Sequence, residues 1–313
     1  MQPPPHAMSA AQKILVVHYS QTGQLSRLVQ NFIAPLHNQP GIEVDTVNIA
    51  PREAFPFPWP FWRFFDTFPE TVHLKPQPID IPNPAHDDYD VVVIAYTVWF
   101  LSPAQPITAF LQQAQTRALL NGKPVITLIG CRNMWLTAQE KMKQLLAGNG
   151  AKLIGNIVKT DACGTAASFV TTPAWLLTGE RQYFKNLPAA GISEAELADM
   201  ARFGQKLADK LQSGSALDET LFRNMGAVAV DEKLILSEKA GARSFFLWGK
   251  LLIAAGKISP LLRCVLLAVY IVFLIVLILT VVPLSALVKM LLRPVLRPWL
   301  VQQKQYYSQP SGE

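Results

Sequence analysis

An uncharged apolar stretch near the carboxyl end constrains this chain more than any other feature of its sequence. The 25 residues between Arg263 and Lys289 contain no Asp, Glu, Lys or Arg. Within them, the 19 residues from Cys264 to Val282 are mostly Leu, Ile and Val. A helix of that length is roughly 28 Å long, close to the ~30 Å hydrocarbon core of a bilayer. We therefore predict a transmembrane or membrane-inserted helix over residues 258–283. The alternative is a buried core helix, although a core helix of this length usually carries a polar stripe.

The basic residues of the chain accompany this stretch. The whole chain has a net charge of +6, yet residues 1–240 hold 20 Lys and Arg against 21 Asp and Glu, whereas residues 241–313 hold 8 against 1. Residues 284–313 place Lys289, Arg293 and Arg297 four apart on one helix face, so we expect a basic interfacial tail there. Cations beside an apolar surface favour membrane lipid as a partner and argue against nucleic acid.

The amino-terminal residues do not resemble an export signal. Residues 1–11 are polar and Pro-rich, so we expect them to be disordered, and the first apolar run is too short for a signal peptide. The three cysteines have neither metal-ligand nor disulfide spacing, which favours a reducing compartment. We expect the protein at the cytoplasmic membrane with its main domain on the cytoplasmic side, and we expect no metal site.

Strand and helix patterns alternate through residues 12–212, which we predict to form one α/β domain. Short apolar runs, typical of strands buried on both faces of a sheet, alternate with helices that have one apolar face. The predicted strands are residues 13–17, 42–49, 90–95, 123–129 and 151–158, and the predicted helices are residues 25–36, 106–118, 136–147 and 193–211. This alternation predicts a doubly wound, five-stranded parallel sheet with helices on both faces. Residues 213–257 are expected to be an amphipathic connection to the membrane segment.

Ligands in such sheets bind beyond the carboxyl ends of the strands, so three loops are candidate binding sites. The first loop offers hydroxyl groups, a glycine and the free N–H groups of the next helix, which can hold a phosphate without Lys or Arg. The second has a large aromatic residue that can cover a flat conjugated ring, and the third supplies polar side chains. The candidate residues are Ser20, Gln21, Thr22, Gly23, Gln24, Leu25 and Ser26 in the first loop, Tyr96, Thr97, Val98, Trp99 and Phe100 in the second, and Gly130, Cys131, Arg132 and Asn133 in the third. The alternatives are an ordinary strand-to-helix turn for the first loop and core packing for Trp99.

Together the three loops resemble those of the flavodoxin-like FMN-binding family. The matching pieces are Tyr19-Ser-Gln-Thr-Gly23, Thr97-x-Trp99 followed by Pro103, and Gly122-Lys-Pro-Val125 leading into the third loop. The resemblance implies a flavodoxin-like domain over residues 12–212 with FMN as its cofactor. It implies that the phosphate binds at residues 20–24 and that the isoalloxazine lies between residues 97–100 and 130–133. One departure is Leu25, where the family often has Thr.

Residues 55–70 form an aromatic insertion in this domain. The segment carries 8 of the chain's 30 aromatic residues, and Phe61, Phe64, Phe65 and Phe68 fall at helical spacing. We interpret these four as a substrate-contacting face for a long acyl chain or as a wedge against the membrane. Packing against the C-terminal segment is the alternative.

A narrower resemblance, to the dialkylresorcinol-condensing (aromatase) family, rests on this insertion, the Tyr19–Leu25 loop and Arg243-Ser-Phe-Phe-x-x-Gly-Lys250. It implies a ketosynthase as a pathway partner and a lipophilic substrate, a dialkylcyclohexanedione, which loses two hydrogens to become a dialkylresorcinol. Because a flavin is a two-electron acceptor, the function that we expect is that of a membrane-anchored FMN-dependent oxidoreductase. The alternatives are an NAD(P)H:quinone reductase and a non-enzymatic electron carrier. The loops identify no catalytic base, since His18 at the end of the first strand is more typical of a structural hydrogen bond.

Overall fold

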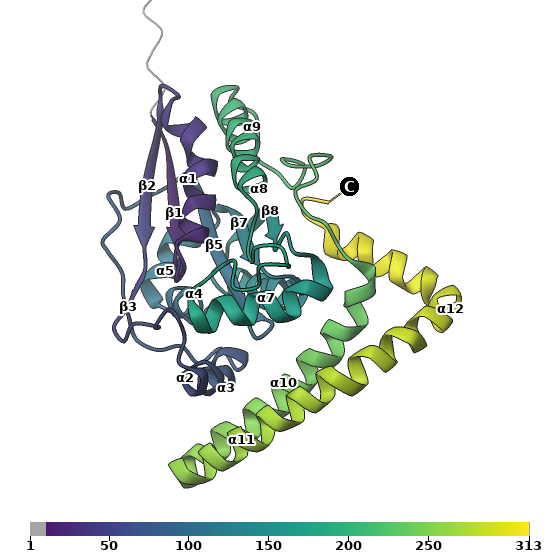
Figure 1. Cartoon of the computed structure of the whole chain (residues 1–313). Coiled ribbons are helices and arrows are strands. Elements are labelled where there is room, and N and C mark those ends of the chain that lie inside the picture. The colour runs from purple at the N-terminus through teal and green to yellow at the C-terminus, as the bar shows by residue number, and fades with distance from the viewer. Residues whose placement is uncertain (1–10, 313) are drawn as a thin grey trace, which may run out of the picture.

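The computed structural model describes residues 11–312, without the side chains of residues 282, 283, 285–290 and 293. Five parallel strands form its main sheet in the order β2-β1-β5-β7-β8 (Figure 1). They are β1 (Gln12–His18), β2 (Ile42–Asn48), β5 (Val91–Trp99), β7 (Pro124–Cys131) and β8 (Lys152–Thr160). This is the flavodoxin-like strand order, so the predicted doubly wound parallel sheet is confirmed. Apart from Ala11, the amino-terminal residues expected to be disordered lie outside the described part of the chain.

Alternate residues of each strand enter two separate apolar layers, because successive side chains of a strand point to opposite faces. Ile14 and Val16 of β1 pack with α1 (Gln24–His37) and α9 (Met200–Gln212). Leu15 and Val17 pack on the other face with α4 (Gln105–Leu111) and α6 (Leu136–Gly148). Both faces of the sheet are therefore covered by helices.

Two of the predicted helices are interrupted. The helix expected over residues 106–118 is α4 followed by α5 (Ala114–Leu120), and the one expected over residues 193–211 is α8 (Glu194–Ala198) followed by α9. The start of α8 is capped by Ser193, whose hydroxyl accepts from the Glu196 N–H.

The carboxyl edge of the sheet is covered by chain that follows β2 and β8. α7 (Gly164–Thr178) runs across this edge, and the short helices α2 (Phe61–Asp66) and α3 (Phe68–Val72) lie beside it (Figure 1). The Trp59 N–H donates to the Leu176 carbonyl at 2.8 Å, which ties the aromatic insertion to α7. The antiparallel pair β3 (Ala50–Pro51) and β4 (Ile79–Asp80) closes the base of the insertion.

The C-terminal part of the chain is helical almost throughout. It comprises α10 (Glu232–Ile258), α11 (Pro260–Val276), the π-helical stretch η1 (Leu277–Val281) and α12 (Val282–Ser308), and α11 runs back along α10 (Figure 1). Residues Pro260–Val281 are long and apolar enough to cross a membrane, and only 17% of their most apolar window is buried, so they do not form a core helix. The helical path continues past Pro283. The π-helical stretch ends at Val281, and the proline is one of the first residues of α12, where its missing N–H is tolerated.

Both ends of the α11–α12 stretch contact the sheet domain and its insertion. At its start, the Arg263 guanidinium donates to the Asp66 and Glu70 carboxylates at 2.7 Å each. At its end, Leu300 and Tyr307 enter the core on the α6 face of the sheet, and the Asn156 N–H of β8 donates to the hydroxyl of Ser311 at 2.5 Å. The apolar stretch therefore leaves this domain and returns to it. The side chains of Lys289 and Arg293, two of the predicted interfacial cations, lie outside the described residues.

Candidate functional site

The loops after β1, β5 and β7 lie together at the carboxyl edge of the sheet. β1 has β2 on one side and β5 on the other, so the chain winds in opposite directions from β1 and the following connections diverge. Such a switch point leaves a crevice where ligands bind in doubly wound sheets. The strand order therefore brings the three predicted loops to one place.

The first loop presents backbone N–H groups without protein acceptors. Gly23 has a φ of 78° and begins α1, and no acidic residue lies in the first turn of that helix. Within the described part of the chain, the N–H groups of residues 20–23 donate to no protein group, and the buried hydroxyl oxygen of Ser20 has no partner. Uncompensated N–H groups at a helix N-terminus attract anions. The Thr22 hydroxyl oxygen lies 3.5 Å from the Gln24 N–H.

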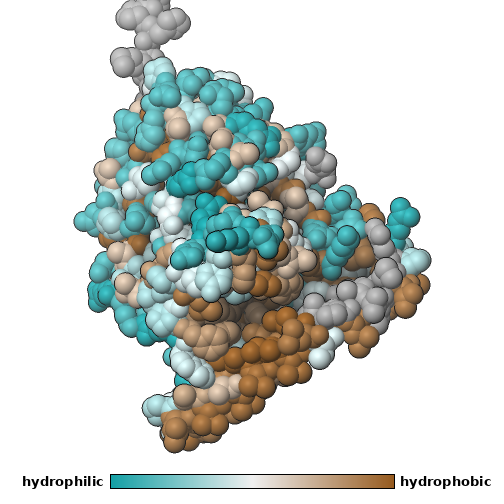
Figure 2. All heavy atoms as spheres, viewed as in Figure 1, coloured by the Kyte–Doolittle hydropathy of each residue, from teal (hydrophilic) through white to brown (hydrophobic). Residues whose placement is uncertain are grey.

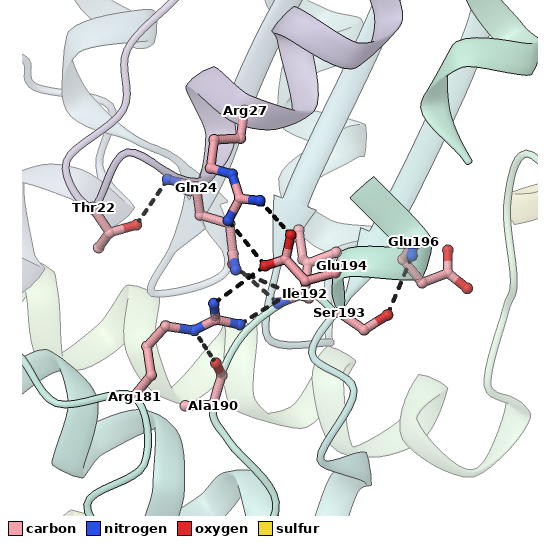
Figure 3. Close-up of polar contacts among 9 residues, drawn as sticks. All are labelled: Thr22, Gln24, Arg27, Arg181, Ala190, Ile192, Ser193, Glu194 and Glu196. Carbon is pink, nitrogen blue, oxygen red and sulfur yellow. Dashed lines mark hydrogen bonds and ion pairs between the residues drawn. The ribbon is translucent and has the colours of Figure 1, made fainter. Parts of the chain in front are cut away.

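The two glutamines of the first loop brace it against other segments. The Gln24 amide donates to the Ile192 carbonyl at 3.1 Å and accepts from the Ile192 N–H at 3.0 Å (Figure 3). The Gln21 amide donates to the Pro56 carbonyl at 2.7 Å and accepts from the Trp59 indole at 3.0 Å. These bonds hold the loop against residues 56–59 and Ile192.

Two arginines lie beside this loop, although the loop itself contains no cation. Arg27 of α1 and Arg181 both contact the Glu194 carboxylate (Figure 3). Arg181 also donates to the carbonyls of Ala190 and Ile192 at 2.8 and 3.1 Å. The local sequence gave no indication of this cluster, because Arg27 lies more than 150 residues before Arg181 and Glu194 and meets them only through the fold.

Leu25 and Ser26 face away from the loop's open side. Leu25 is 4% exposed and packs in the core, where a Cβ on Gly130 would approach its Cδ1 to 3.2 Å. The glycine that starts the third loop thus makes room for Leu25, which explains a leucine where the resembling family often has Thr. The Ser26 hydroxyl lies 3.2 Å from Nε2 of His18, and burial lowers the pKa of that histidine.

The second loop is a tight hairpin with a strained turn. β6 (Ser102–Pro103) pairs with the end of β5, and the two turn residues, Phe100 and Leu101, have φ values of 49° and 57°. Non-glycine residues in this region cost about 1 to 3 kcal/mol each and cluster at functional sites. The Lys141 ammonium of α6 holds the turn by donating to the Ser102 hydroxyl at 2.7 Å and to the Val72 carbonyl at 2.9 Å. Burial lowers the pKa of Lys141 to about 8.

Trp99 lies at the centre of an aromatic cluster at the carboxyl edge. Its ring makes edge-to-face contacts with Phe55, Trp59 and Tyr19 at centroid distances of 4.9, 5.6 and 6.1 Å. Thr97 and Val98 belong to the strand end, where the Thr97 carbonyl accepts from the Ala104 N–H and Val98 pairs with Pro103.

Tyr96 does not face the loops. Its side chain is fully buried and its hydroxyl donates to Gln139 of α6 at 2.6 Å. Alternation along β5 places this side chain in the helix-covered layer, where it packs with the α6 face of the core.

The third loop carries a buried arginine. Nε of Arg132 donates to the Ser168 hydroxyl at 3.1 Å, and its guanidinium lies 4.1 Å from the ring centroid of Phe169. Its Nη2 atom is buried and has no hydrogen-bond partner within residues 11–312 as far as their side chains are described. The neighbouring Cys131 thiol is buried, and burial raises its pKa, so it is an inert thiol at neutral pH.

A cavity of about 260 Å³ lies beside the third loop. Its walls come from the third loop, the end of β8, the start of α7 and the start of α10, and they include Arg132, Asn133 and Glu238. Glu238 is 1% exposed, accepts from the Thr137 N–H at 2.5 Å, and has one carboxylate oxygen without a partner. Burial raises its pKa to about 7. The sequence analysis did not identify Glu238. Its position three residues after Ile235 places this acid on the apolar face of the helix, where a charged residue is unusual.

The four predicted phenylalanines of the insertion have different environments. Phe61 is 43% exposed, whereas Phe68 is fully buried and stacks on Tyr270 of α11 at 4.6 Å. Phe64 contacts the ring of Phe100 in the second loop at 4.9 Å, and Phe65 contacts Phe61 at 5.0 Å. Phe68 therefore packs against the C-terminal segment, which is the alternative interpretation of the insertion.

The comparisons with known proteins concern the sheet domain. No protein-family profile matches the chain, and no curated protein matches its sequence significantly. Its structure is similar to a flavoprotein in complex with FMN from Lactobacillus acidophilus NCFM, with 18% identity, 47% of this chain and 93% of that chain covered, and a TM-score of 0.39. It is also similar to a flavodoxin from the domain Archaea (11% identity, 64% and 99% covered, TM-score 0.34). A third similar structure is an oxidoreductase from Corynebacterium diphtheriae (14% identity, 66% and 99% covered, TM-score 0.33). At these scores, the fold assignment rests on the strand order of this chain itself.

Proposed function

We propose that this protein is an FMN-dependent oxidoreductase that works at a membrane surface on a hydrophobic ring substrate. The observation that carries the proposal is the first loop, with its unpartnered N–H groups and the unpartnered Ser20 hydroxyl at the switch point of the sheet. The solved relatives described as a flavoprotein with FMN and as a flavodoxin have the same kind of fold.

The residues of the loop fit a phosphate monoester. The Ser20 and Thr22 hydroxyls and the N–H groups before α1 are donors, and no carboxylate in the first turn of α1 would repel the anion. Trp99 is a half-buried aromatic side chain at the end of β5, the strand on the other side of the switch point, and Phe55 and Trp59 hold its ring by edge-to-face contacts. When bound there, FMN supplies a two-electron acceptor. The protein's part is to hold the cofactor, exclude water and orient the ring substrate.

Within this class, we favour aromatisation of a dialkylcyclohexanedione to a dialkylresorcinol, with a ketosynthase supplying the substrate. The support is that the aromatic insertion contacts both the apolar helices and the second loop. Phe68 stacks on Tyr270 of α11, and Phe64 contacts Phe100 in the second loop. A substrate with two alkyl chains partitions into lipid by about 0.8 kcal/mol for each buried CH₂, so a site beside lipid-facing helices receives it directly.

Membrane attachment is from one side in this proposal. Exposed apolar residues run along α10 and α11 and form a continuous hydrophobic band (Figure 2). Exposed cations, Lys250 and Lys257, accompany that band, as expected for a surface that meets anionic headgroups. Because Arg263 and Ser311 both bind the same domain, the helices between them enter and leave the lipid on one face of the membrane. The flavin domain then lies on the cytoplasmic side.

Flavin binding is tested on the full chain purified in detergent. We expect the visible flavin spectrum in the purified protein or after titration with FMN. Ser20→Ala should weaken FMN binding about 10-fold, since a hydrogen bond to a charged group contributes about 1.5 to 3 kcal/mol. Thr178→Ala, which removes an exposed hydroxyl at the end of α7, is the matched control. A folded full chain that takes up no FMN would refute the proposal.

The reaction is tested by the choice of reductant. A dialkylcyclohexanedione should reduce the flavin in rapid mixing experiments, and NADPH should not. Reduction by NADPH alone would instead favour the quinone reductase, and reduction by neither would favour an electron carrier.

The one-sided attachment is tested with single cysteines. Lys257→Cys and Gln302→Cys mark the two sides of the apolar stretch, in a background without the native cysteines. In sealed vesicles with the flavin domain outward, a membrane-impermeant maleimide should label both positions. Labelling of only one of them would mean that the stretch crosses the bilayer.

A further inference from the structure

A buried carboxyl and a buried guanidinium line the same cavity without contacting each other. Glu238 and Arg132 are both among the walls of the 260 Å³ cavity beside the third loop. One oxygen of Glu238 and Nη2 of Arg132 have no hydrogen-bond partner among the described residues. Buried polar atoms are nearly always satisfied in native proteins, so two unpartnered ones in the same cavity indicate a ligand with polar groups.

Each of the two groups is held in place by its other atoms. The second oxygen of Glu238 accepts from the Thr137 N–H at the start of α6, and Nε of Arg132 donates to Ser168 of α7. The packing of Arg132 on Phe169 fixes the plane of the guanidinium. A carboxyl and a cation fixed in this way, with one free atom each, are arranged as a base and an oxyanion stabiliser.

We propose that Glu238 is the acid–base residue of this cavity and that Arg132 holds the oxygen of an enolate formed there. The ligand is a cyclic ketone or dione with a C–H bond next to its carbonyl. That C–H bond breaks, its proton moves to the free oxygen of Glu238, and its electron pair moves into the carbonyl to give an enolate oxygen facing Arg132. Return of the proton reverses the step, so no oxidant is needed for it.

The surroundings of Glu238 suit proton exchange near neutral pH. Burial raises its pKa to about 7, which is near the optimum for a general base. The charged or titratable groups around it are Arg132 and Cys131 of the third loop, Tyr96 of β5, Asp161 after β8, Asp231 at the start of its own helix and Tyr307 of α12. The cavity is smaller than the 300 to 1,000 Å³ typical of sites for drug-sized ligands, so it takes the ring and leaves alkyl chains outside.

This inference rests on the proposed function for its substrate class, but its test does not require a flavin. The first probe is 4-nitrophenol, whose phenolate imitates an enolate and absorbs differently from the neutral form. Arg132→Gln should weaken phenolate binding at least 10-fold, whereas Glu238→Gln should strengthen it, because a negative charge is removed while the acceptor for Thr137 remains. Arg117→Gln and Glu180→Gln, at exposed positions on α5 and after α7, should leave binding unchanged.

The second probe is 5-pentylcyclohexane-1,3-dione, followed by mass spectrometry for deuterium uptake at the ring carbons beside a single carbonyl. Glu238→Gln should slow the protein-catalysed exchange at least 100-fold, the smaller end of what a general base contributes. Exchange that is unaffected by Glu238→Gln, or phenolate binding indifferent to both variants, would overturn the proposal. If FMN fails to bind but exchange depends on Glu238, the redox function is wrong and the acid–base site stands. If FMN binds but the exchange rate does not depend on Glu238, the acid–base site is wrong and the redox function stands.

Discussion

Replacement of Gly204 by alanine is the most direct test of how the sheet domain positions its first loop. Gly204 lies on α9 where that helix meets α1, and a Cβ at this position would be 1.9 Å from the Phe32 carbonyl oxygen and 3.0 Å from its carbon. Ordinary contact begins at 3.4 Å, so the two helices would have to separate by more than 1 Å. Phe32, Phe203 and Leu207, which are fully buried at this interface, would lose packing at the same time.

Overpacking of this kind costs typically 1 to 3 kcal/mol. We expect Gly204→Ala to fall near the upper end, about 3 kcal/mol, because the clash is with backbone and cannot be relieved by a side-chain rotation. The loop before α1 moves with the helix, so FMN binding should also weaken.

The assay is urea unfolding of the full chain in detergent, followed by circular dichroism. Gly148→Ala is the matched control, because it also adds a methyl group to a helical glycine, but its Cβ would meet nothing within 4 Å. Helix propensity predicts that this control is neutral or stabilising by up to about 1 kcal/mol. A Gly204→Ala protein within about 0.5 kcal/mol of the parent, the range of ordinary surface substitutions, would refute the close helix approach.

Three further predictions follow from burial. Phe68→Ala should cost about 3 to 5 kcal/mol in urea unfolding, as large buried aromatic truncations do, while the exposed Phe61→Ala should change stability by less than about 0.5 kcal/mol. Because burial raises the pKa of Glu238 from 4.5 to about 7, the folded state binds more protons than the unfolded state between these values, and stability should fall as pH rises through this window. Glu238→Gln should remove that slope and stabilise the protein above pH 7 by roughly 3 kcal/mol; an unchanged slope would contradict the assignment. In vesicles, the exposed Cys264 on α11 should react with a lipid-soluble maleimide and poorly with a charged one, whereas buried Cys131 should react with neither before denaturation; peptide mass spectrometry distinguishes the two thiols.

The sheet and its loops were predictable because they depend on local patterns. The runs around Ile14 and Val92 are apolar on both faces, which is typical of a parallel sheet, and the strand order confirmed this interpretation. The glycine before α1 and the hydroxyls around it could likewise be identified as a loop that presents N–H groups. Predictions about single side chains were less secure, because Tyr96 and Leu25 lie in the right segments but point into the core.

Other parts of the candidate site could not be read from local sequence. Glu238 and Arg132 are more than 100 residues apart, and only the docking of α10 on α6 places them at one cavity. The bracing of Gln24 by Ile192 and the contact of Arg27 with Glu194 also join distant segments. The role of Lys141 in holding the strained Phe100–Leu101 turn required the position of α6 against the hairpin.

For the apolar stretch near the carboxyl end, local composition and long-range contacts determine different properties. Its composition alone predicted an apolar helix over residues 258–283, because a long stretch without charge is a local property, and the structure has an apolar helical stretch at Pro260–Val281. Composition could not determine how the chain enters and leaves that stretch. The contacts of Arg263 with Asp66 and Glu70, and of Ser311 with Asn156, join it at both ends to one domain. They arise only when segments more than 150 residues apart fold against each other.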